Sequence, residues 1–297
     1  MTEILRIAAE VQQTLDEEGA VVALETTLVA HGFPPGVGVE VGRAAEAAVR
    51  SEGAVPATVG VLDGAVVVGL DDEELQRFGE AGAEARKAGP RDLAACVATG
   101  ELGATTVGGT LTAARLAGIR FMGTGGIGGV HRGFAERLDV SADLAQLART
   151  PALVVSSGIK SLLDVPATAE LLETLGVPVL GYRTDELPLF YSAGGGPPVS
   201  ARVDEPEQAA RTARAHWTLG GAALLLAREP DDGVDVEPLV NEALAAAATQ
   251  GIYGQGVTPF VLQFLHEHSG GRTLEVNREL IVANARLAAQ VAVAATP

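Results

Sequence analysis

The stretch ATTVGGTLTAARLAGIRFMG, residues 104–123, shows most directly which kind of fold this chain forms. Its two ends, residues 104–107 and 119–123, are predicted to be short strands, and residues 110–117 between them have helical composition and spacing. A strand, a helix and a second strand in this order are typical of an α/β protein. The same alternation continues in both directions along the chain.

Working outward, we expect an α/β fold, a single-domain layered fold with a central mixed sheet flanked by helices. Asp63-Gly64 lies between two valine-rich arms and predicts a hairpin over residues 57–70. Further strands are predicted at residues 20–29, 153–156, 177–182 and 222–226. Helices are predicted at residues 39–52, 71–78, 90–99 (with Pro90 in its first turn), 141–149, 166–175, 205–218, 237–250, 258–266 and 273–294.

One domain over residues 1–297 is expected from this pattern. The Gly/Pro-rich residues 192–198 are the part of the chain most similar to a linker. Strand and helix patterns nevertheless continue on both sides of it, so we interpret it as a mobile loop within the domain.

The charge balance bears on the partners of the protein. The chain has 38 acidic and 21 basic residues, a net charge of −17, a pI near 4.7 and 47% hydrophobic residues. This composition supports a sizeable core and argues against intrinsic disorder. It also argues against nucleic acid or an anionic membrane as a partner, because both are bound mainly through basic residues. We expect a small-molecule substrate.

The location of the protein is also predicted from its composition. The single cysteine, Cys96, cannot form an internal disulfide, and the first 20 residues carry acids where a signal peptide would be basic and then apolar. No uncharged apolar stretch reaches the roughly 18 residues of a membrane span. We therefore expect a soluble, cytoplasmic protein.

Lysine is rare in this chain. Lys87 and Lys160 are its two lysines, and every other basic residue among the 21 is arginine. Only lysine can lose its proton and act as a nucleophile or form a Schiff base, because arginine stays charged in proteins. The alternative is that two lysines remain by chance, so the local sequence has to decide.

Lys160 is the stronger candidate for covalent chemistry. It follows the buried strand LVVS and a Ser-Ser-Gly turn, at the end of a strand where α/β proteins bind ligands. Its ordinary pKa of roughly 10.4 would have to fall for attack on a carbon at neutral pH, and burial is the usual means. The alternative is a surface lysine at the start of a helix.

Lys87 lies in the segment ARKAGPRD, which we interpret as a loop before a helix, with Arg86 and Arg91 close in sequence. A local basic region on an acidic protein predicts a site for a phosphate monoester. A solvated loop would have the same composition.

Glu25 is the first candidate for proton transfer. It stands in the otherwise apolar run VVALETTLV, and a buried carboxylate without a partner has a raised pKa and keeps its proton near neutral pH. Glu25 is therefore a candidate general acid. The alternative is a carboxylate at an exposed strand end or paired with an arginine.

The glycine-rich stretch GTGGIGGVHRG, residues 123–133, contains G-x-G-x-x-G after a predicted strand, with Asp143 20 residues beyond its first glycine. A dinucleotide fingerprint would open a helix directly. Here the glycines continue, and Thr124, His131 and Arg132 follow no helical stripe. We favour a loop whose backbone amides and His131 approach a small anionic or polar ligand.

The next segment, RLDVSADL, carries acidic residues after this loop. Ser141 can cap the following helix and Asp143 suits its first turn, which explains both structurally. Asp139 is not needed for the cap. With His131 and water it could hold a hard divalent ion such as Mg²⁺ or Mn²⁺, although no spacing typical of a structural zinc site occurs.

Taken together, these segments resemble the pseudouridine-5′-phosphate glycosidase family, also called indigoidine synthase A-like. The matching stretches cover nearly the whole chain and are ALETTLVAHGFP (23–34), GTGGIGGVHRG (123–133), DVSADL (139–144), SGIKSLLDVPAT (157–168), GYRTDELP (181–188), VTPF (257–260) and NARLAA (284–289). The chain departs from the family at YSAGGG (191–196), including Gly194 to Gly196, where a more polar loop is expected.

The resemblance implies roles for individual residues. Lys160 matches the family's Schiff-base lysine, Glu25 its proton donor and Asp139 its metal-binding aspartate, usually with Mn²⁺. The substrate-binding positions that it implies are Lys87, Val107, Thr124, His131, Ser141, Ala142, Asp143 and Asn284. Asn277 is an alternative to Asn284 on the same predicted helix. The family also implies a homotrimer.

The activity implied by the resemblance is the reversible cleavage of pseudouridine 5′-phosphate to uracil and ribose 5-phosphate. Its base is joined to ribose by a carbon–carbon bond, so a pair of carboxylates would have to expel a poor carbanion. Attack by Lys160, with protonation of the ring oxygen by Glu25 and of the uracil carbon, offers another route. The alternatives are another lysine-dependent lyase or aldolase on a sugar phosphate or different C-nucleotide, a non-catalytic binding protein, and a dinucleotide-dependent oxidoreductase.

Overall fold

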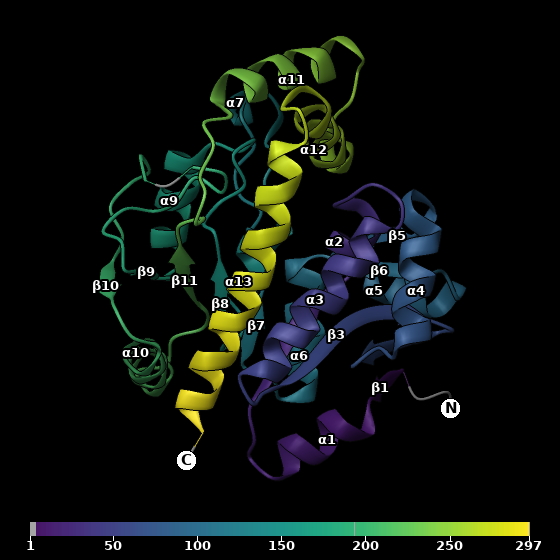
Figure 1. The fold of residues 1–297 in the computed structure, drawn as a ribbon, viewed down its shortest axis with the longest axis vertical. Coiled ribbons are helices and arrows are strands. Elements are labelled where there is room, and N and C mark those ends of the chain that lie inside the picture. Colours follow the sequence, from purple (N-terminus) through teal and green to yellow (C-terminus); the bar gives the residue numbers. More distant parts are fainter. Residues whose placement is uncertain (1–3, 193, 297) are drawn as a thin grey trace.

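The computed structural model describes residues 4–192 and 194–296, and across them one 11-stranded mixed sheet forms the centre of the molecule (Figure 1). The strands are β1 (Leu5–Ile7), β2 (Val21–Glu25), β3 (Val55–Leu62), β4 (Ala65–Val68), β5 (Arg86–Ala88), β6 (Gly103–Thr105), β7 (Phe121–Gly123), β8 (Leu153–Ser156), β9 (Val179–Tyr182), β10 (Ala201–Val203) and β11 (Leu224–Arg228).

The strand order is β1-β4-β3-β2-β7-β8-β11-β9-β10, and β6 joins β3 while β5 joins β6. The β3–β4 hairpin and the β3–β6 pair are antiparallel, whereas β2, β7, β8 and β11 run parallel to their neighbours. The predicted central mixed sheet flanked by helices is therefore confirmed. Because β2, β7 and β8 are adjacent and parallel, their carboxyl ends meet at one edge of the sheet.

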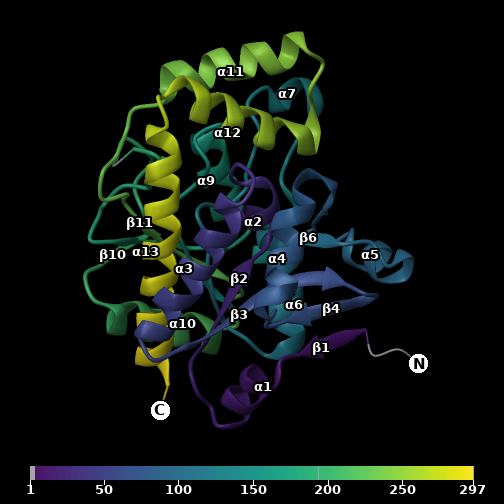
Figure 2. The same ribbon diagram turned by 45° about the vertical axis from the view of Figure 1, so that its right-hand side comes forward.

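Helices cover the sheet and close its carboxyl edge. They are α1 (Ala9–Asp16), α2 (Thr27–His31), α3 (Val37–Ser51), α4 (Asp72–Ala81), α5 (Leu93–Thr99), α6 (Val107–Ala117), α7 (Phe134–Arg137), α8 (Ala142–Leu147), α9 (Val165–Thr174), α10 (Pro206–Thr218), α11 (Glu237–Thr249), α12 (Val257–His268) and α13 (Arg272–Ala295). The long helix α13 packs on β7, β8 and β2, and α3 and α10 lie beside it (Figures 1 and 2). The pair α11 and α12 lies above the end of the sheet at which these strands finish (Figure 2).

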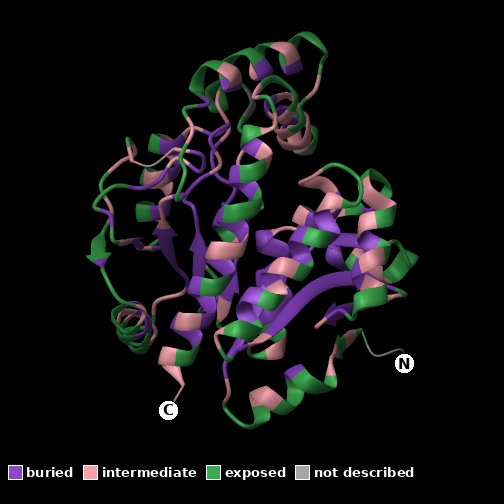
Figure 3. Ribbon diagram, in the orientation of Figure 1, coloured by how far each residue is buried: buried purple, intermediate pink, exposed green. Residues whose placement is uncertain are grey.

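The hydrophobic core lies along the central strands. All five residues of β2 and all four of β8 are buried, and Figure 3 shows the middle of the sheet as continuously buried. Strands covered on both faces need apolar residues throughout, which explains the unbroken apolar runs in the sequence. Within the described residues, no helix combines the length and the apolar character that crossing a membrane requires.

Most predicted elements are confirmed with shifts of a few residues. The hairpin turns at Asp63-Gly64, with Asp63 at φ 52° and Gly64 at φ 79°. Ser141 caps α8 as predicted, since its Oγ accepts a hydrogen bond from the amide of Asp143 at 3.2 Å. The predicted C-terminal helix is present as α13.

Four local predictions are wrong. The strand predicted over residues 20–29 ends at Glu25, and residues 27–31 form the helix α2. Lys87 lies in the short strand β5 rather than in a loop. Pro90 precedes α5 instead of lying in its first turn, and α6 begins at Val107, so the strand predicted to that residue ends at Thr105.

Other elements had no prediction, namely β1, α1, β10 and the one-turn helix α7. The loop that departs from the family pattern lies partly outside the described residues, because residue 193 is not described. Near it, the amide of Gly195 donates a 2.6 Å hydrogen bond to Glu186 Oε2.

Candidate active site

Three neighbouring parallel strands deliver the central polar side chains. Glu25 is the last residue of β2, Thr124 follows β7 directly, and Lys160 lies in the turn after β8. Since these strands are adjacent in the order β2-β7-β8, the residues after their carboxyl ends come together at one edge of the sheet. The prediction that Lys160 lies at the ligand-binding end of a strand is thus confirmed in its geometry.

Glu25 is buried, with 4% of its surface exposed. Burial raises the pKa of its carboxyl, and it outweighs the attraction of Lys160 and the hydrogen bond that Thr124 Oγ1 donates to Glu25 Oε1. The neutral acid is therefore favoured at a higher pH than in an exposed glutamate. Glu25 can therefore act as a proton donor.

The turn that carries Lys160 is held from two sides. Gly158 has φ 79°, and a Cβ there would lie 2.0 Å from the carbonyl oxygen of Pro188, so only glycine fits. Arg132 donates hydrogen bonds of 2.9 Å and 3.3 Å to the carbonyls of Ser161 and Leu163, and it also pairs with Glu237 on α11 at 2.7 Å. Arg132 therefore fixes the lysine turn instead of facing a ligand.

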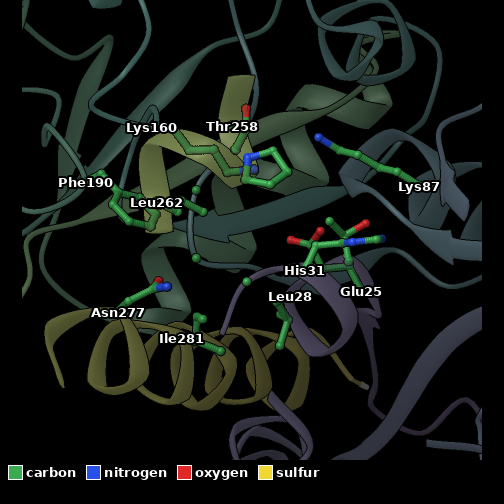
Figure 4. A pocket seen from close by; sticks show the side chains of 15 residues that line it. Glu25, Leu28, His31, Lys87, Lys160, Phe190, Thr258, Leu262, Asn277 and Ile281 are labelled. Carbon is green, nitrogen blue, oxygen red and sulfur yellow. The ribbon is translucent and has the colours of Figure 1, made fainter. Parts of the chain in front are cut away.

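Lys87 reaches the site from β5, which joins the central sheet through β6. Burial and the charge of Lys160 lower the pKa of its amine to about 8, although Asp143 and Glu25 oppose this shift. Figure 4 shows Lys87 and Lys160 reaching into the same cavity from opposite sides. Strand β5 is only three residues long, too short to show a periodic pattern in the sequence. Its pairing with β6 sets the position of Lys87.

The cavity has two compartments that meet at Glu25, Thr27, Lys87, Lys160 and Thr258, which line both. Counting the space at their open mouths, the first has a volume of about 510 Å³ and the second about 1090 Å³. Their linings differ in chemistry, because the first is mostly apolar and the second carries more polar side chains. The two lysines and the glutamate stand at the junction.

The apolar compartment is bounded by α2, α12, α13 and the glycine-rich loop. Apolar side chains and glycines shared by these elements line it, namely Leu28, Gly125, Gly126, Phe190, Pro259, Leu262 and Ile281. Its polar lining beyond the junction is His31 and Asn277 (Figure 4). Flat apolar walls with a few polar groups suit a planar ring with hydrogen-bonding edges.

The polar compartment contains most of the segment after the glycine-rich loop. Its lining includes Gly89, Arg91, Asp92, Thr106, Gly128, His131, Asp139, Val140, Ser141, Ala142 and Asp143. Arginine, hydroxyls and the nearby Lys87 suit a phosphorylated polyol. Val107 is buried at the start of α6 and is not part of this lining, although its neighbour Thr106 is.

Asp143 ties two backbone segments together. Its Oδ1 accepts a 2.8 Å hydrogen bond from the amide of Gly108, and its Oδ2 accepts a 3.0 Å bond from the amide of Gly128. A Cβ at Gly128 would lie 2.3 Å from Ser141 Oγ and 2.8 Å from Asp143 Oδ2, so this glycine is required for the approach. The helix-dipole explanation from the sequence is incomplete, because Asp143 also holds the floor of the polar compartment.

The glycine-rich loop is not a dinucleotide fingerprint. Residues 124–133, all of them described, form no helix, and α7 begins only at Phe134. Asn284 on α13 supports this loop from behind: its Nδ2 donates to the carbonyls of Thr124 at 2.8 Å and Gly125 at 3.3 Å. Asn284 is fully buried, whereas Asn277, on the same helix, lines the apolar compartment.

Asp139 and His131 form the remaining acidic pair, with His131 Nδ1 3.8 Å from Asp139 Oδ2. Burial lowers the pKa of His131, which favours the neutral imidazole that binds metals. Across the described chain, no group of three His, Cys, Asp or Glu side chains is placed to hold a metal ion. The pair fits an ion such as Mn²⁺ only if water or substrate oxygens supply the other positions.

Sequence reasoning missed several lining residues. Thr27 donates hydrogen bonds to the carbonyls of Thr105 at 2.7 Å and Ala104 at 3.1 Å, and His31 lies at the end of the same short helix. Thr258 on α12 lies at the junction of the compartments. The polar Thr-Thr pair after Glu25 was the available signal that the strand ends there.

The chain is similar to known proteins over nearly its whole length. The family model described as indigoidine synthase A like protein matches residues 10–294. Curated pseudouridine-5′-phosphate glycosidases from Paracoccus denitrificans and Streptomyces griseus are 45% and 48% identical, covering 99% and 97% of this chain and 99% and 91% of theirs.

Two solved structures are also similar over almost their full length. The prealnumycin C-glycosynthase AlnA, in complex with ribulose 5-phosphate, superposes with a TM-score of 0.90 at 42% identity and covers 100% of this chain and 98% of its own. An indigoidine synthase A-like protein from Thermotoga maritima has a TM-score of 0.88 at 36% identity, with 98% and 96% covered.

Proposed function

Because this chain belongs to the indigoidine synthase A-like family, we propose that it cleaves the carbon–carbon glycosidic bond of pseudouridine 5′-phosphate, giving uracil and ribose 5-phosphate. The observation that carries the proposal is the position of Lys160 and Glu25 at the junction of an apolar and a polar compartment. The uracil would occupy the apolar side and the phosphorylated ribose the polar side. The ribulose 5-phosphate named with the similar AlnA structure supports a sugar-phosphate ligand.

The first chemical step would open the sugar. The neutral amine of Lys160 attacks C1′ of the ribose, the C1′–O4′ bond breaks, and Glu25 gives its proton to O4′. The raised pKa of Glu25 supports this role, since the acid stays protonated in the buried site. The carboxylate formed then stabilises the new ammonium on Lys160, which lies close enough to interact with it.

The second step would release the base. The secondary ammonium on Lys160 gives its proton to the Glu25 carboxylate, and the Glu25 acid then protonates the uracil carbon bonded to C1′. The freed lone pair of the Lys160 nitrogen forms a C=N bond, and the C–C bond breaks with its electron pair returning to the protonated uracil ring. Water then hydrolyses the iminium to the sugar aldehyde and frees the lysine. Each step is an ordinary proton transfer or substitution, so the route avoids a free carbanion.

The other groups would bind and orient the substrate. Lys87 and Arg91 would hold the phosphate, and the segment from Ser141 to Asp143 would contact the sugar phosphate through its hydroxyl and backbone. Asn277 faces the base, whereas Asn284 would act by holding the loop at Thr124.

A divalent ion, Mn²⁺ or a similar metal, belongs to the proposal. Asp139 and His131 would hold it, and when bound it would supply positive charge that orients substrate oxygens and water. We also propose that the protein is a homotrimer, for which the exposed Phe134 and Leu138 offer apolar surface. We propose a cytoplasmic location as well.

A different aromatic carbon partner is the second candidate, because the similar AlnA structure, with a TM-score of 0.90, is named a C-glycosynthase. Chemically, the same lysine and acid would serve, and only the occupant of the apolar compartment would change. Competition between uracil and other carbon nucleophiles for ribose 5-phosphate separates the two.

The direct test is uracil release from pseudouridine 5′-phosphate in the presence of Mn²⁺, with Lys160→Ala measured beside the wild type. We expect release by the wild type and its loss in the variant. No release from a folded, metal-loaded wild type would reject this substrate, and borohydride trapping with other sugar phosphates would then identify the right one.

A further inference from the structure

One histidine nitrogen in the apolar compartment has no partner in the protein. His31 lies at the end of α2 and lines this compartment, and its Nε2 is buried without a hydrogen-bond partner among the described residues. A buried polar atom left unpaired destabilises the fold, so such an atom at a ligand site indicates a partner on the ligand.

The state of the ring decides what that partner has to be. Burial and the charge of Lys87 lower the pKa of His31, so the imidazole is neutral. The backbone of Ala85 opposes this lowering of the pKa, as a hydrogen-bond acceptor does, and since Nε2 has no partner, we assign the ring N–H to Nδ1. In a neutral ring with one N–H, the free nitrogen is an acceptor. Nε2 therefore needs an N–H or O–H from the ligand.

The base of a C-nucleotide offers such a donor and the base of an N-nucleotide does not. In both, the uracil edge presents two carbonyls with an N–H between them. When the sugar is attached to carbon, the ring nitrogen N1 keeps its hydrogen; when the sugar is attached to N1, that hydrogen is absent. An acceptor in the base compartment can thus recognise the substrate by the linkage that is cleaved.

Resting on the proposed function, we propose that His31 Nε2 accepts a hydrogen bond from the N1–H of the C-linked uracil and is a specificity-determining residue of this enzyme. Asn277, across the same compartment, offers both a donor and an acceptor to the carbonyl and N3–H edge (Figure 4). The two side chains together cover the hydrogen-bonding groups of the base, with apolar walls above and below it.

The contact would also assist bond cleavage. When the ring carbon receives a proton, N1 supplies electrons and gains positive charge, and its N–H becomes a stronger donor. The hydrogen bond to His31 therefore stabilises the protonated base more than the unprotonated base. An interaction that strengthens in this way lowers the barrier to bond cleavage.

The test compares pseudouridine 5′-phosphate with its 1-methyl derivative, which lacks the donor, in wild type, His31→Phe and His31→Gln. Phenylalanine keeps the bulk of the ring without an acceptor, and the glutamine amide oxygen restores one. In the wild type we expect kcat/KM to be about 10- to 100-fold lower for the methyl derivative. His31→Phe is expected to turn over both substrates equally, and His31→Gln to keep the preference.

His266→Phe is a matched control. His266 has a buried Nε2 without a partner among the described residues and a pKa lowered by burial. It lines a neighbouring hollow and not the apolar compartment, whereas His31 lines both. The His266→Phe variant should prefer the unmethylated substrate by the same factor as the wild type.

Three results would overturn the inference: equal turnover of both substrates by the wild type, an unchanged preference in His31→Phe, or the same behaviour of the Phe and Gln variants. If the wild type releases no uracil from either substrate, the proposed function itself has failed. The wild-type comparison needs no variant, so it remains decisive if His31→Phe does not fold.

Discussion

Glu25 and Lys160 stand at the carboxyl ends of β2 and β8, two strands separated by β7 alone, and both side chains reach the junction of the same two compartments. The distance of 135 positions between them in the sequence is closed by parallel pairing in a single sheet. A buried acid and an amine at this point can act on the same bond of a ligand.

Replacing Glu25 by glutamine should remove the proton donor and stabilise the fold. We expect uracil release to fall by about 10²- to 10⁴-fold, the usual contribution of a general acid. Burial raises the pKa of Glu25 above its ordinary 4.5. Between the pKa of the unfolded state and the higher pKa of the folded state, the folded state therefore binds more protons. The free energy of unfolding therefore falls as pH rises through this window.

Glutamine cannot ionise, so the melting temperature of Glu25→Gln should exceed that of the wild type at pH 8 and approach it near pH 4. Melting curves at both pH values check this sign. A variant that is less stable than the wild type at pH 8 would show that the carboxylate, not the acid, is the form the fold favours.

Lys87 should make substrate binding depend on pH. Its pKa is lowered to about 8 in the free protein, so its positive charge is lost as pH rises through that value. We expect KM for the phosphorylated substrate to rise above pH 8 in the wild type and to stay flat in Lys87→Arg, which remains charged. Initial rates between pH 6.5 and about 9.5 test this, and a KM independent of pH in the wild type would remove Lys87 from phosphate binding.

The two asparagines of α13 should behave differently. Asn284→Ala leaves the carbonyls of Thr124 and Gly125 without their buried donor, and we expect a loss of about 1–3 kcal/mol in the free energy of unfolding. Asn277→Ala should leave stability nearly unchanged and raise KM. Urea denaturation and kinetics of both variants separate these effects, and equal destabilisation would contradict the assignment.

Asp139 and the exposed Glu136 of α7, three positions before it, form a matched pair for the metal. Asp139→Asn should raise the Mn²⁺ concentration needed for half-maximal activity by at least about tenfold, because it removes the proposed carboxylate ligand. Glu136→Gln changes the charge equally and should have no such effect. Identical metal titrations of the two variants would place the metal elsewhere.

Much of the central site could be predicted from local sequence. Glu25 and Lys160 interrupt apolar runs of strand length, and the ends of such strands in α/β proteins are where ligands bind. The glycine loop was also predicted correctly as a loop, since continued glycines and unpatterned polar residues are incompatible with a helix that begins at once.

The remaining features depend on tertiary structure. After Thr26 and Thr27, residues 28–30 are again apolar, and such short runs suit a strand or a buried helix equally, so α2 and with it His31 were missed. Lys87 is aimed by pairing of a three-residue strand with β6, which leaves no periodic signal. Asn277 and Asn284 are seven positions apart, two helical turns or roughly 10 Å, so they share a helix face and only the packing of α13 distinguishes them.

The proposed covalent bond between Lys160 and the sugar can be trapped, because cyanoborohydride reduces the iminium to a stable amine. The wild type incubated with pseudouridine 5′-phosphate or ribose 5-phosphate should gain the mass of one reduced pentose phosphate, and peptide mapping should place it on Lys160. Lys160→Ala, with Lys87 intact, should gain nothing. Uracil release accompanied by an adduct on Lys87, or by none on either lysine, would contradict the account.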